Sequence, residues 1–252
     1  MPITAIAESL FKMRLKKLFM AAACLLSLPL QATDAVTITT PRGAPITVTA
    51  NFPEGAGPFP AVVLGPGTGT MKQKINEVVE SELLKHNIAV FRFEWAFYVK
   101  DKNGKPSDTD RSAEIEDFTT VLGLAKADKR VNRNAIIVGG KSRGTVIAWQ
   151  VFRTDPTLKG ILQLTPVCSK EGFTADQLYP EINSEPRPSL WIAGDADSAC
   201  QPKTLYSFLA RAGGAARAAI VIGDHGLATE STSQLTAELS TDFVLDVHKN
   251  KH

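Results

Sequence analysis

Apolar and polar residues alternate along the first part of the chain, and short continuous apolar runs follow. Residues 36–40 and 46–50 alternate with a period of two, which predicts two short strands joined through a turn at 41–43. The later runs are separated by longer stretches with helical spacing, so each run is interpreted as a buried strand. These predicted strands cover residues 61–64, 88–93, 135–138, 160–164, 190–193 and 218–222.

Helices are predicted between and after these strands, at residues 73–85, 111–127, 144–152, 203–212 and 233–248. The last helix has an apolar residue at every fourth position, which predicts a stripe packed into the core: Leu235, Leu239, Phe243 and Val247. Two irregular stretches remain, at 95–106 and 168–187. Buried strands that alternate with helices are typical of a parallel sheet covered on both faces. We therefore expect an α/β fold with a mostly parallel central sheet, helices on both faces and an antiparallel N-terminal hairpin.

The N-terminal 32 residues have the pattern of an export signal. The apolar run at 18–26 is too short to span a membrane, and four basic residues precede it: Lys12, Arg14, Lys16 and Lys17. Residues 30–32 would suit a signal peptidase, and either Met1 or Met13 could be the start. We expect cleavage, with a membrane anchor as the alternative. The mature protein would then be one domain over 33–252, secreted or periplasmic, without lasting membrane association.

Charge and cysteine content change the picture once that segment is set aside. The sequence has 28 Lys and Arg against 26 Asp and Glu. The signal removes four basic residues and one acidic residue, which leaves 24 against 25, so no surface for nucleic acid is expected. Cys168 and Cys200 remain, in a compartment that permits oxidation. Each follows a predicted strand at the same sheet edge, where either a disulfide or two free thiols could exist.

A Gly-x-Ser-x-Gly pattern follows the third of the buried runs. Gly140, Ser142 and Gly144 stand between a predicted strand and a predicted helix. A sharp turn there would expose the serine oxygen and point the helix N-terminus at it, and glycines would avoid collisions in the turn. The pattern alone is weak because glycine and serine are common residues. The structural alternative is a serine that merely caps the helix.

A serine nucleophile needs a base, usually a histidine that a carboxylate holds in place. Of the four histidines, His225 is expected at the carboxyl end of a strand, the edge where ligands collect in open α/β sheets. The loop after the preceding strand offers Asp197, which we favour, and Asp195, which we expect to complete the turn. Asp224 is expected to cap a turn. His248 lies in the last predicted helical turn, where a cation suits the helix dipole.

Backbone N–H groups are expected to hold the oxyanion that develops during acyl transfer. One belongs to Arg143, at the start of the helix. The other should come from the glycine-rich loop 65–70, where Thr68 is the best candidate. A phosphate-binding loop is the rival interpretation, but the Lys-Ser/Thr ending of that motif is absent.

Other residues near the expected site have two interpretations each. Lys141 and Arg143 flank the serine; either both point to solvent, or one attracts an anionic group of the substrate. Trp95 and Tyr98 follow a strand at the same edge, and they either line an apolar substrate pocket or pack under a loop. No stretch is long enough for a separate lid domain.

Three segments together resemble the small dienelactone-hydrolase-like branch of the α/β-hydrolase superfamily. They are the loop Pro66-Gly67-Thr68-Gly69, the strand 88–93 and the elbow 139–144, which is the sharp turn from strand to helix that carries the serine. The resemblance runs from about residue 60 to the last helix. It implies the α/β-hydrolase fold and serine-dependent acyl hydrolysis, with catalytic roles for Ser142, Asp197 and His225. Relatives usually have His-Gly where this chain has Pro66-Gly67, and a small apolar residue or methionine in place of Arg143.

The leading interpretation is therefore an exported serine hydrolase that cleaves a carboxylic ester or a related acyl bond of a small molecule. No cluster of His and Asp suggests a metal, and no cofactor is expected. The alternative is a non-catalytic binding module on the same scaffold. The choice among ester, thioester, lactone and amide stays open, as does the oligomeric state.

Overall fold

The computed structural model describes residues 35–107, 109–169 and 172–249. The predicted signal peptide, residues 1–32, lies outside the described residues, so its cleavage and the choice between Met1 and Met13 stay predictions. In the part of the chain that the structure describes, no helix has both the length and the apolar character needed to cross a membrane.

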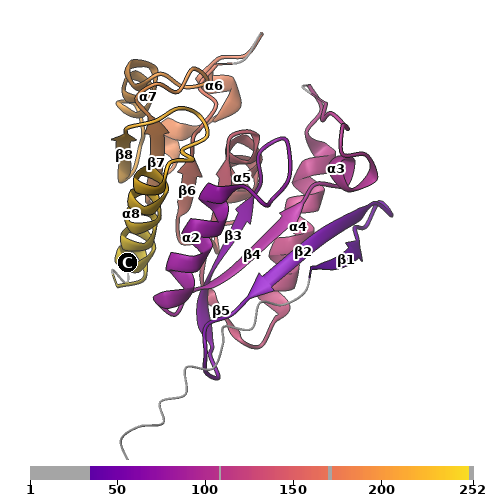
Figure 1. Ribbon diagram of the computed structural model, residues 1–252. Helices are drawn as coiled ribbons and strands as arrows, with labels where there is room; N and C mark the ends of the chain where they lie inside the picture. Colours follow the sequence, from indigo (N-terminus) through magenta and orange to yellow (C-terminus); the bar gives the residue numbers. More distant parts are fainter. Residues whose placement is uncertain (1–34, 108, 170–171, 250–252) are drawn as a thin grey trace, which may run out of the picture. The chain divides into compact units, whose positions relative to one another are not determined.

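One sheet contains all the predicted strands, in the order β1-β2-β4-β3-β5-β6-β7-β8 (Figure 1). The pairs β1·β2 and β2·β4 are antiparallel, and the other neighbours are parallel. The strands are β1 (Val36–Thr39), β2 (Pro45–Asn51), β3 (Phe59–Gly65), β4 (Ala89–Glu94), β5 (Val131–Lys141), β6 (Ile161–Leu164), β7 (Ser189–Gly194) and β8 (Ala216–Val221). The predicted parallel sheet with an antiparallel hairpin at one edge is confirmed.

The predicted helices are also present, and short ones fill the stretches expected to be irregular. The helices are α2 (Lys74–Lys85), α3 (Ala96–Lys100), α4 (Ser112–Ala127), α5 (Arg143–Thr154), α6 (Ala175–Leu178), η1 (Ile182–Ser184), α7 (Pro202–Leu209) and α8 (Glu230–Lys249). The sequence analysis missed α3, α6 and η1 because three to five residues are too few to show helical periodicity.

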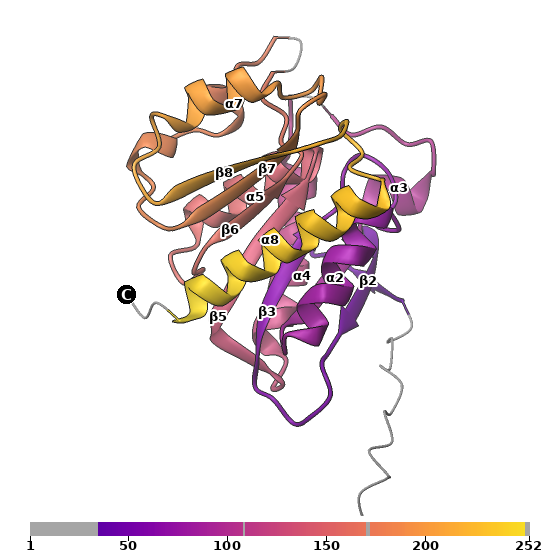
Figure 2. The same ribbon diagram turned by 60° about the vertical axis from the view of Figure 1, so that its left-hand side comes forward.

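Helices cover both faces of the sheet, as Figure 2 shows for α2 and α8 in front of the strands. In β3, Val62 and Leu64 pack with α2 and α8, whereas Ala61 and Val63 pack with α4 and α5 on the opposite face. Successive side chains of a strand point to opposite faces, and both faces are buried here. A continuous apolar run is the sequence pattern that such a strand requires.

The stripe predicted for α8 is partly wrong. Phe243 is buried, and Leu239 and Val247 are partly buried and pack against the core, but Leu235 is 45% exposed. The buried face consists mainly of small residues: Thr232, Ser233, Thr236, Ala237, Ser240, Thr241 and Val244. This face packs beside α2, and small side chains let two helices approach closely. The hydroxyl of Ser240 can be buried because it donates to the Thr236 carbonyl within the helix, at 2.6 Å.

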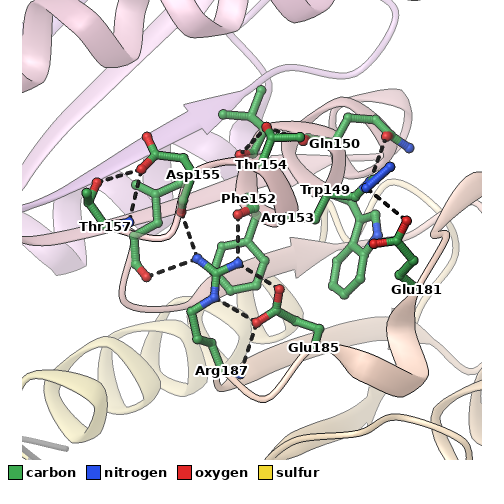
Figure 3. Close-up of polar contacts among 12 residues, drawn as sticks. Trp149, Gln150, Phe152, Arg153, Thr154, Asp155, Thr157, Glu181, Glu185 and Arg187 are labelled. Carbon is green, nitrogen blue, oxygen red and sulfur yellow. Dashed lines mark hydrogen bonds and ion pairs between the residues drawn. The ribbon is translucent and has the colours of Figure 1, made fainter.

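A charged cluster holds the C-terminal end of α5, the helix that begins directly after Ser142 (Figure 3). The Arg187 guanidinium donates to the carbonyl oxygens of Phe152 and Asp155, each at 2.8 Å, and of Leu158 at 3.3 Å. It also pairs with the Glu185 carboxylate at 2.7 Å. The last carbonyls of a helix lack partners within the helix and carry partial negative charge. Arg187 supplies both the donors and the opposite charge.

Candidate active site

Ser142 forms a one-residue turn between β5 and α5. Its backbone has φ 51° and ψ −121°, a region that residues with a Cβ rarely adopt and that costs on the order of 1–3 kcal/mol. Its N–H donates to the Leu164 carbonyl at 2.9 Å, and its carbonyl accepts from the Thr145 N–H at 2.9 Å. These bonds hold the strained turn between the next strand and the first turn of the helix.

The glycines on either side of Ser142 are needed by the geometry of this turn, as predicted. A Cβ on Gly140 would lie 2.1 Å from the carbonyl of Gly144, and a Cβ on Gly144 would lie 2.5 Å from the carbonyl oxygen of Pro66. Both distances are well below van der Waals contact. A Cβ on Gly67 would lie 3.5 Å from the Ser142 Cβ, so the glycine-rich loop is directly beside the serine.

The structure brings Ser142, His225 and Asp197 together. The serine Oγ is 2.8 Å from the histidine Nε2, and the histidine Nδ1 is 2.9 Å from Asp197 Oδ1 and 3.0 Å from Oδ2. Asp197 is 1% exposed, whereas the imidazole is partly open to solvent. The carboxylate accepts from Nδ1–H, which leaves Nε2 of the neutral ring as the acceptor for the serine O–H. This is the arrangement that a general base needs.

The other two carboxylates near His225 bond to loop backbone instead of to the imidazole. Asp195 Oδ1 accepts from the Gly223 N–H at 2.8 Å, and Asp224 Oδ1 accepts from the Gly226 N–H at 2.8 Å. Asp224 therefore caps a local turn, as expected, whereas Asp195 joins its own loop to the loop that follows β8, so the turn-completing role expected for Asp195 is wrong. Among these three acids, only Asp197 contacts the histidine ring.

A disulfide joins Cys168, in the loop after β6, to Cys200, in the loop that carries Asp197. The same loops are also connected by a backbone bond from the Cys168 N–H to the Ala199 carbonyl, at 3.0 Å. Asp197 Oδ1 accepts from the Ala199 N–H at 2.8 Å. The acid is thus held from its own loop and, through the disulfide, from the neighbouring one.

The two cations that flank the serine point inward, so the interpretation that both face solvent is wrong. Arg143 is buried and pairs with the buried Glu114, whose Oε1 lies 2.9 Å from the guanidinium Nε. It also donates to the carbonyl of Ser107. Its charge is therefore met inside the protein, which removes the reason to expect that it attracts an anionic substrate.

Lys141 is 5% exposed, and its Nζ donates to the backbone carbonyl of His225 at 3.2 Å. Burial lowers the pKa of the Lys141 ammonium, and the nearby carboxylates of Asp197 and Asp224 act in the opposite direction. The side chain braces the histidine loop instead of reaching outward. The predicted contact between Lys141 and the substrate stays a prediction.

Trp95 packs beneath the glycine-rich loop, the second of its two predicted roles. Its ring is completely buried and packs edge-on against Phe93, with centroids 4.7 Å apart. Its Nε1–H donates to the Gly67 carbonyl at 2.8 Å. A direct contact of Trp95 with substrate is therefore wrong. Tyr98 is only partly buried, with Lys102 Nζ 4.2 Å from its ring centroid, and its contact with substrate stays a prediction.

The two predicted oxyanion donors lie next to the serine in sequence or in space. Arg143 is the first residue of α5, and the exposed Thr68 follows Gly67 in the loop beside Ser142. Their role stays a prediction. Across residues 35–107, 109–169 and 172–249, no group of three His, Cys, Asp or Glu side chains could hold a metal ion.

The sequence analysis missed Glu114 and Asp117, which hold two parts of the site. Glu114 binds Arg143, and Asp117 Oδ2 accepts from the Ala96 N–H at 2.9 Å, directly after Trp95. Both acids lie on the buried stripe of α4, in register with Phe118 and Val121. Carboxylates on the apolar stripe of a predicted helix were the signal that could have identified them.

Comparison with known proteins agrees with this geometry. The family described as an alpha/beta hydrolase domain matches residues 59–250 of the chain. The protein therefore belongs to the α/β-hydrolase family, and the predicted resemblance to the superfamily is confirmed. No curated protein sequence was found to match the chain.

Several solved structures share the fold at low sequence identity. Est1E from Butyrivibrio proteoclasticus is 15% identical, with a TM-score of 0.69 over 86% of this chain and 100% of its own. An alpha-beta serine hydrolase homologue from Coxiella burnetii is 16% identical, with a TM-score of 0.68 over 85% and 99%. A putative dienelactone hydrolase from Klebsiella pneumoniae subsp. pneumoniae MGH 78578 is 15% identical, with a TM-score of 0.70 over 84% and 98%. The shared fold thus extends to the branch that the motifs indicated.

Proposed function

We propose that this hydrolase cleaves a carboxylic ester or related acyl bond of a small molecule through a covalent acyl-enzyme. The supporting observation is the hydrogen-bonded series from the Ser142 Oγ through the His225 ring to the buried Asp197. The Ser142 oxygen attacks the acyl carbon while His225 Nε2 takes the hydroxyl proton. The bond to the leaving alcohol breaks, and the alcohol receives that proton. Water then attacks the acyl-enzyme in the same way, releasing the acid and restoring the serine.

In this proposal Asp197 orients the ring and stabilises the imidazolium that forms during proton transfer. The N–H groups of Thr68 and Arg143 hold the negative charge that develops on the acyl oxygen. An imidazole accepts a proton only when it is neutral, so the proposed mechanism requires His225 to begin each cycle as the neutral ring.

Export of the protein forms part of the same proposal. Residues 1–32 would direct secretion, and the Cys168–Cys200 disulfide supports an oxidising compartment such as the periplasm or the exterior of the cell.

Labelling with a fluorophosphonate tests the serine chemistry without knowledge of the substrate. The folded protein should be labelled at Ser142, and Ser142→Ala should abolish the labelling. Ser207, exposed on α7, provides the matched control, because Ser207→Ala should label like the wild type. Absence of labelling in a folded wild-type protein would favour a binding module on a hydrolase scaffold.

Hydrolysis of a small panel identifies the bond that is cleaved. The panel contains short p-nitrophenyl esters, a thioester, a lactone and an anilide, each assayed with the wild type and Ser142→Ala. Est1E has also been solved with ferulic acid bound, so a feruloyl ester is included. Turnover that persists in the Ser142→Ala variant would contradict the proposed mechanism.

A further inference from the structure

Two side chains, Arg92 on β4 and Trp95 directly after it, hold carbonyl groups in the segment between β3 and α2, which contains the glycine-rich loop. The indole Nε1–H of Trp95 donates to the Gly67 carbonyl at 2.8 Å, and the guanidinium Nη1 of Arg92 donates to the Met71 carbonyl at 2.8 Å. Both side chains are buried beneath the loop. The loop is therefore anchored from the core side within it, at Gly67, and directly after it, at Met71.

The bond from Trp95 determines the direction of a neighbouring N–H group. The Gly67 carbonyl and the Thr68 N–H belong to the same peptide group, which is planar and trans, so the two point in opposite directions. Since the carbonyl points toward a completely buried indole, the Thr68 N–H points away from the core. Among the described residues this N–H has no hydrogen-bond acceptor in the protein.

That direction matters because the peptide lies beside the nucleophile and can otherwise rotate. A Cβ on Gly67 would be 3.5 Å from the Ser142 Cβ, so the peptide borders the serine. The residue before this peptide is Gly67, and a glycine can change its ψ at little cost, which lets the peptide plane turn. Without a fixed partner for its carbonyl, this peptide could present its oxygen, instead of its N–H, to the site.

Trp95 itself is held independently of the loop. Its ring packs edge-on against Phe93 at 4.7 Å, and the N–H of the next residue, Ala96, donates to the buried Asp117 at 2.9 Å. Asp117 is in turn paired with Arg42, at 2.5 Å. The indole is thus a rigid donor that can impose its orientation on the loop.

We propose that Trp95 is a positioning residue that orients the Thr68 N–H as an oxyanion donor. This inference rests on the proposed serine hydrolase function. An oxyanion donor acts on the transition state more than on the bound substrate, and loss of one such donor typically lowers kcat by about 10²–10³-fold. When a donor is still present but misoriented for part of the time, kcat falls by less than when the donor is removed. We expect loss of the indole N–H to lower kcat about 10- to 100-fold.

Two substitutions remove the indole donor in different ways. Trp95→Phe keeps an aromatic ring in the core, and replacement of Trp95 by β-(3-benzothienyl)alanine keeps the bicyclic shape but lacks the N–H. The chain offers a matched control in Trp149, whose indole also donates to a backbone carbonyl, that of Pro180, at 2.9 Å. Trp149→Phe removes the same kind of hydrogen bond, but its acceptor is the carbonyl of Pro180 and not a group of the glycine-rich loop.

The measurement is the steady-state hydrolysis of the best ester from the panel, together with the thermal midpoint of each variant. Both Trp95 variants should show the loss of kcat with KM within about threefold of the wild type, and Trp149→Phe should keep kcat within about threefold. Unchanged kcat in the benzothienyl variant would overturn the inference. An equal loss of kcat in Trp149→Phe would do the same, because the effect would then follow from stability.

Failure of this inference can be told apart from failure of the proposed function. If wild-type protein is labelled at Ser142 and hydrolyses the ester, while the Trp95 variants keep full kcat, only the role of Trp95 is wrong. If folded wild-type protein is neither labelled nor active, the serine mechanism itself is wrong, and the positioning role falls with it.

Discussion

Removing the disulfide should lower the stability of the protein while leaving its catalytic geometry largely in place. The change is the double substitution Cys168→Ala with Cys200→Ala. The bridge spans a sequence separation of 32 residues. In the chain-entropy account, a loop of this size constrains the unfolded chain by about 3–4 kcal/mol. For a domain of this length, each kcal/mol corresponds to roughly 2–4 °C in Tm, so we expect a fall of about 10 °C.

The active site should survive because its backbone bonds do not depend on the sulfur atoms. The N–H of Ala199 still donates to Asp197, and the N–H of residue 168 still donates to the Ala199 carbonyl. At 25 °C, below the lowered transition, kcat should therefore remain within about threefold of the wild type. Loss of kcat beyond this range would mean that the bridge itself positions Asp197.

Thermal unfolding followed by circular dichroism measures the effect on stability, with ester hydrolysis at 25 °C as the parallel assay. Wild-type protein unfolded in the presence of a reductant should approach the Tm of the double variant, and the reductant should leave the variant unchanged. A fall in Tm of less than about 2 °C would refute the reasoning, because it would show that the bridge does not constrain the unfolded chain appreciably.

Two further predictions concern stability. Arg187→Lys should lower the free energy of unfolding by about 2–3 kcal/mol in urea denaturation, because an ammonium cannot reproduce the fork that binds Glu185 and the end of α5. Arg211, which forms an exposed ion pair with Asp176, supplies the control. Arg211→Lys should lower the free energy of unfolding by less than about 1 kcal/mol, and equal losses in the two variants would contradict the role given to Arg187. Burial lowers the pKa of His248 below its ordinary 6.5, although the Ala135 carbonyl that accepts from Nε2 acts the other way. As the pH falls, His248 therefore binds a proton at a higher pH in the unfolded chain than in the folded protein. The contribution of the neutral ring to stability is present above pH 6.5 and is lost as the pH falls through the folded pKa. The free energy of unfolding is measured in urea at about pH 7.5 and pH 5. It should fall less between these pH values for His248→Gln, which keeps a donor without titrating, than for the wild type; identical falls would refute the assignment.

The lowered pKa of His248 also corrects its predicted role. A cation at the end of α8 would suit the helix dipole, but the imidazole is largely buried, which favours the neutral ring. Proximity to a helix end could be predicted from the sequence, whereas burial against β5 could not.

The sequence by itself determined the order of strands and helices, the position of the turn at Ser142 and the sheet edge to which the loops of Asp197 and His225 belong. These features depend on local patterns: a continuous apolar run predicts a strand buried on both faces, and the carboxyl ends of parallel strands meet at one edge. The need for glycine at 140 was equally local, because a side chain there would collide with Gly144 and Thr145, whereas a side chain at 144 would collide with Gly65 and Pro66 of a distant loop.

Only the tertiary structure decided which way the remaining side chains point. Arg143 turns inward because Glu114, 29 residues away, offers a buried carboxylate, and Lys141 turns inward because the His225 carbonyl lies within its reach. Trp95 lies under the loop because the Gly67 carbonyl faces the core. A buried polar group needs a partner to offset its lost hydration, and that partner can come from anywhere in the chain. Periodicity records burial along one element, but it contains no information about a partner on another.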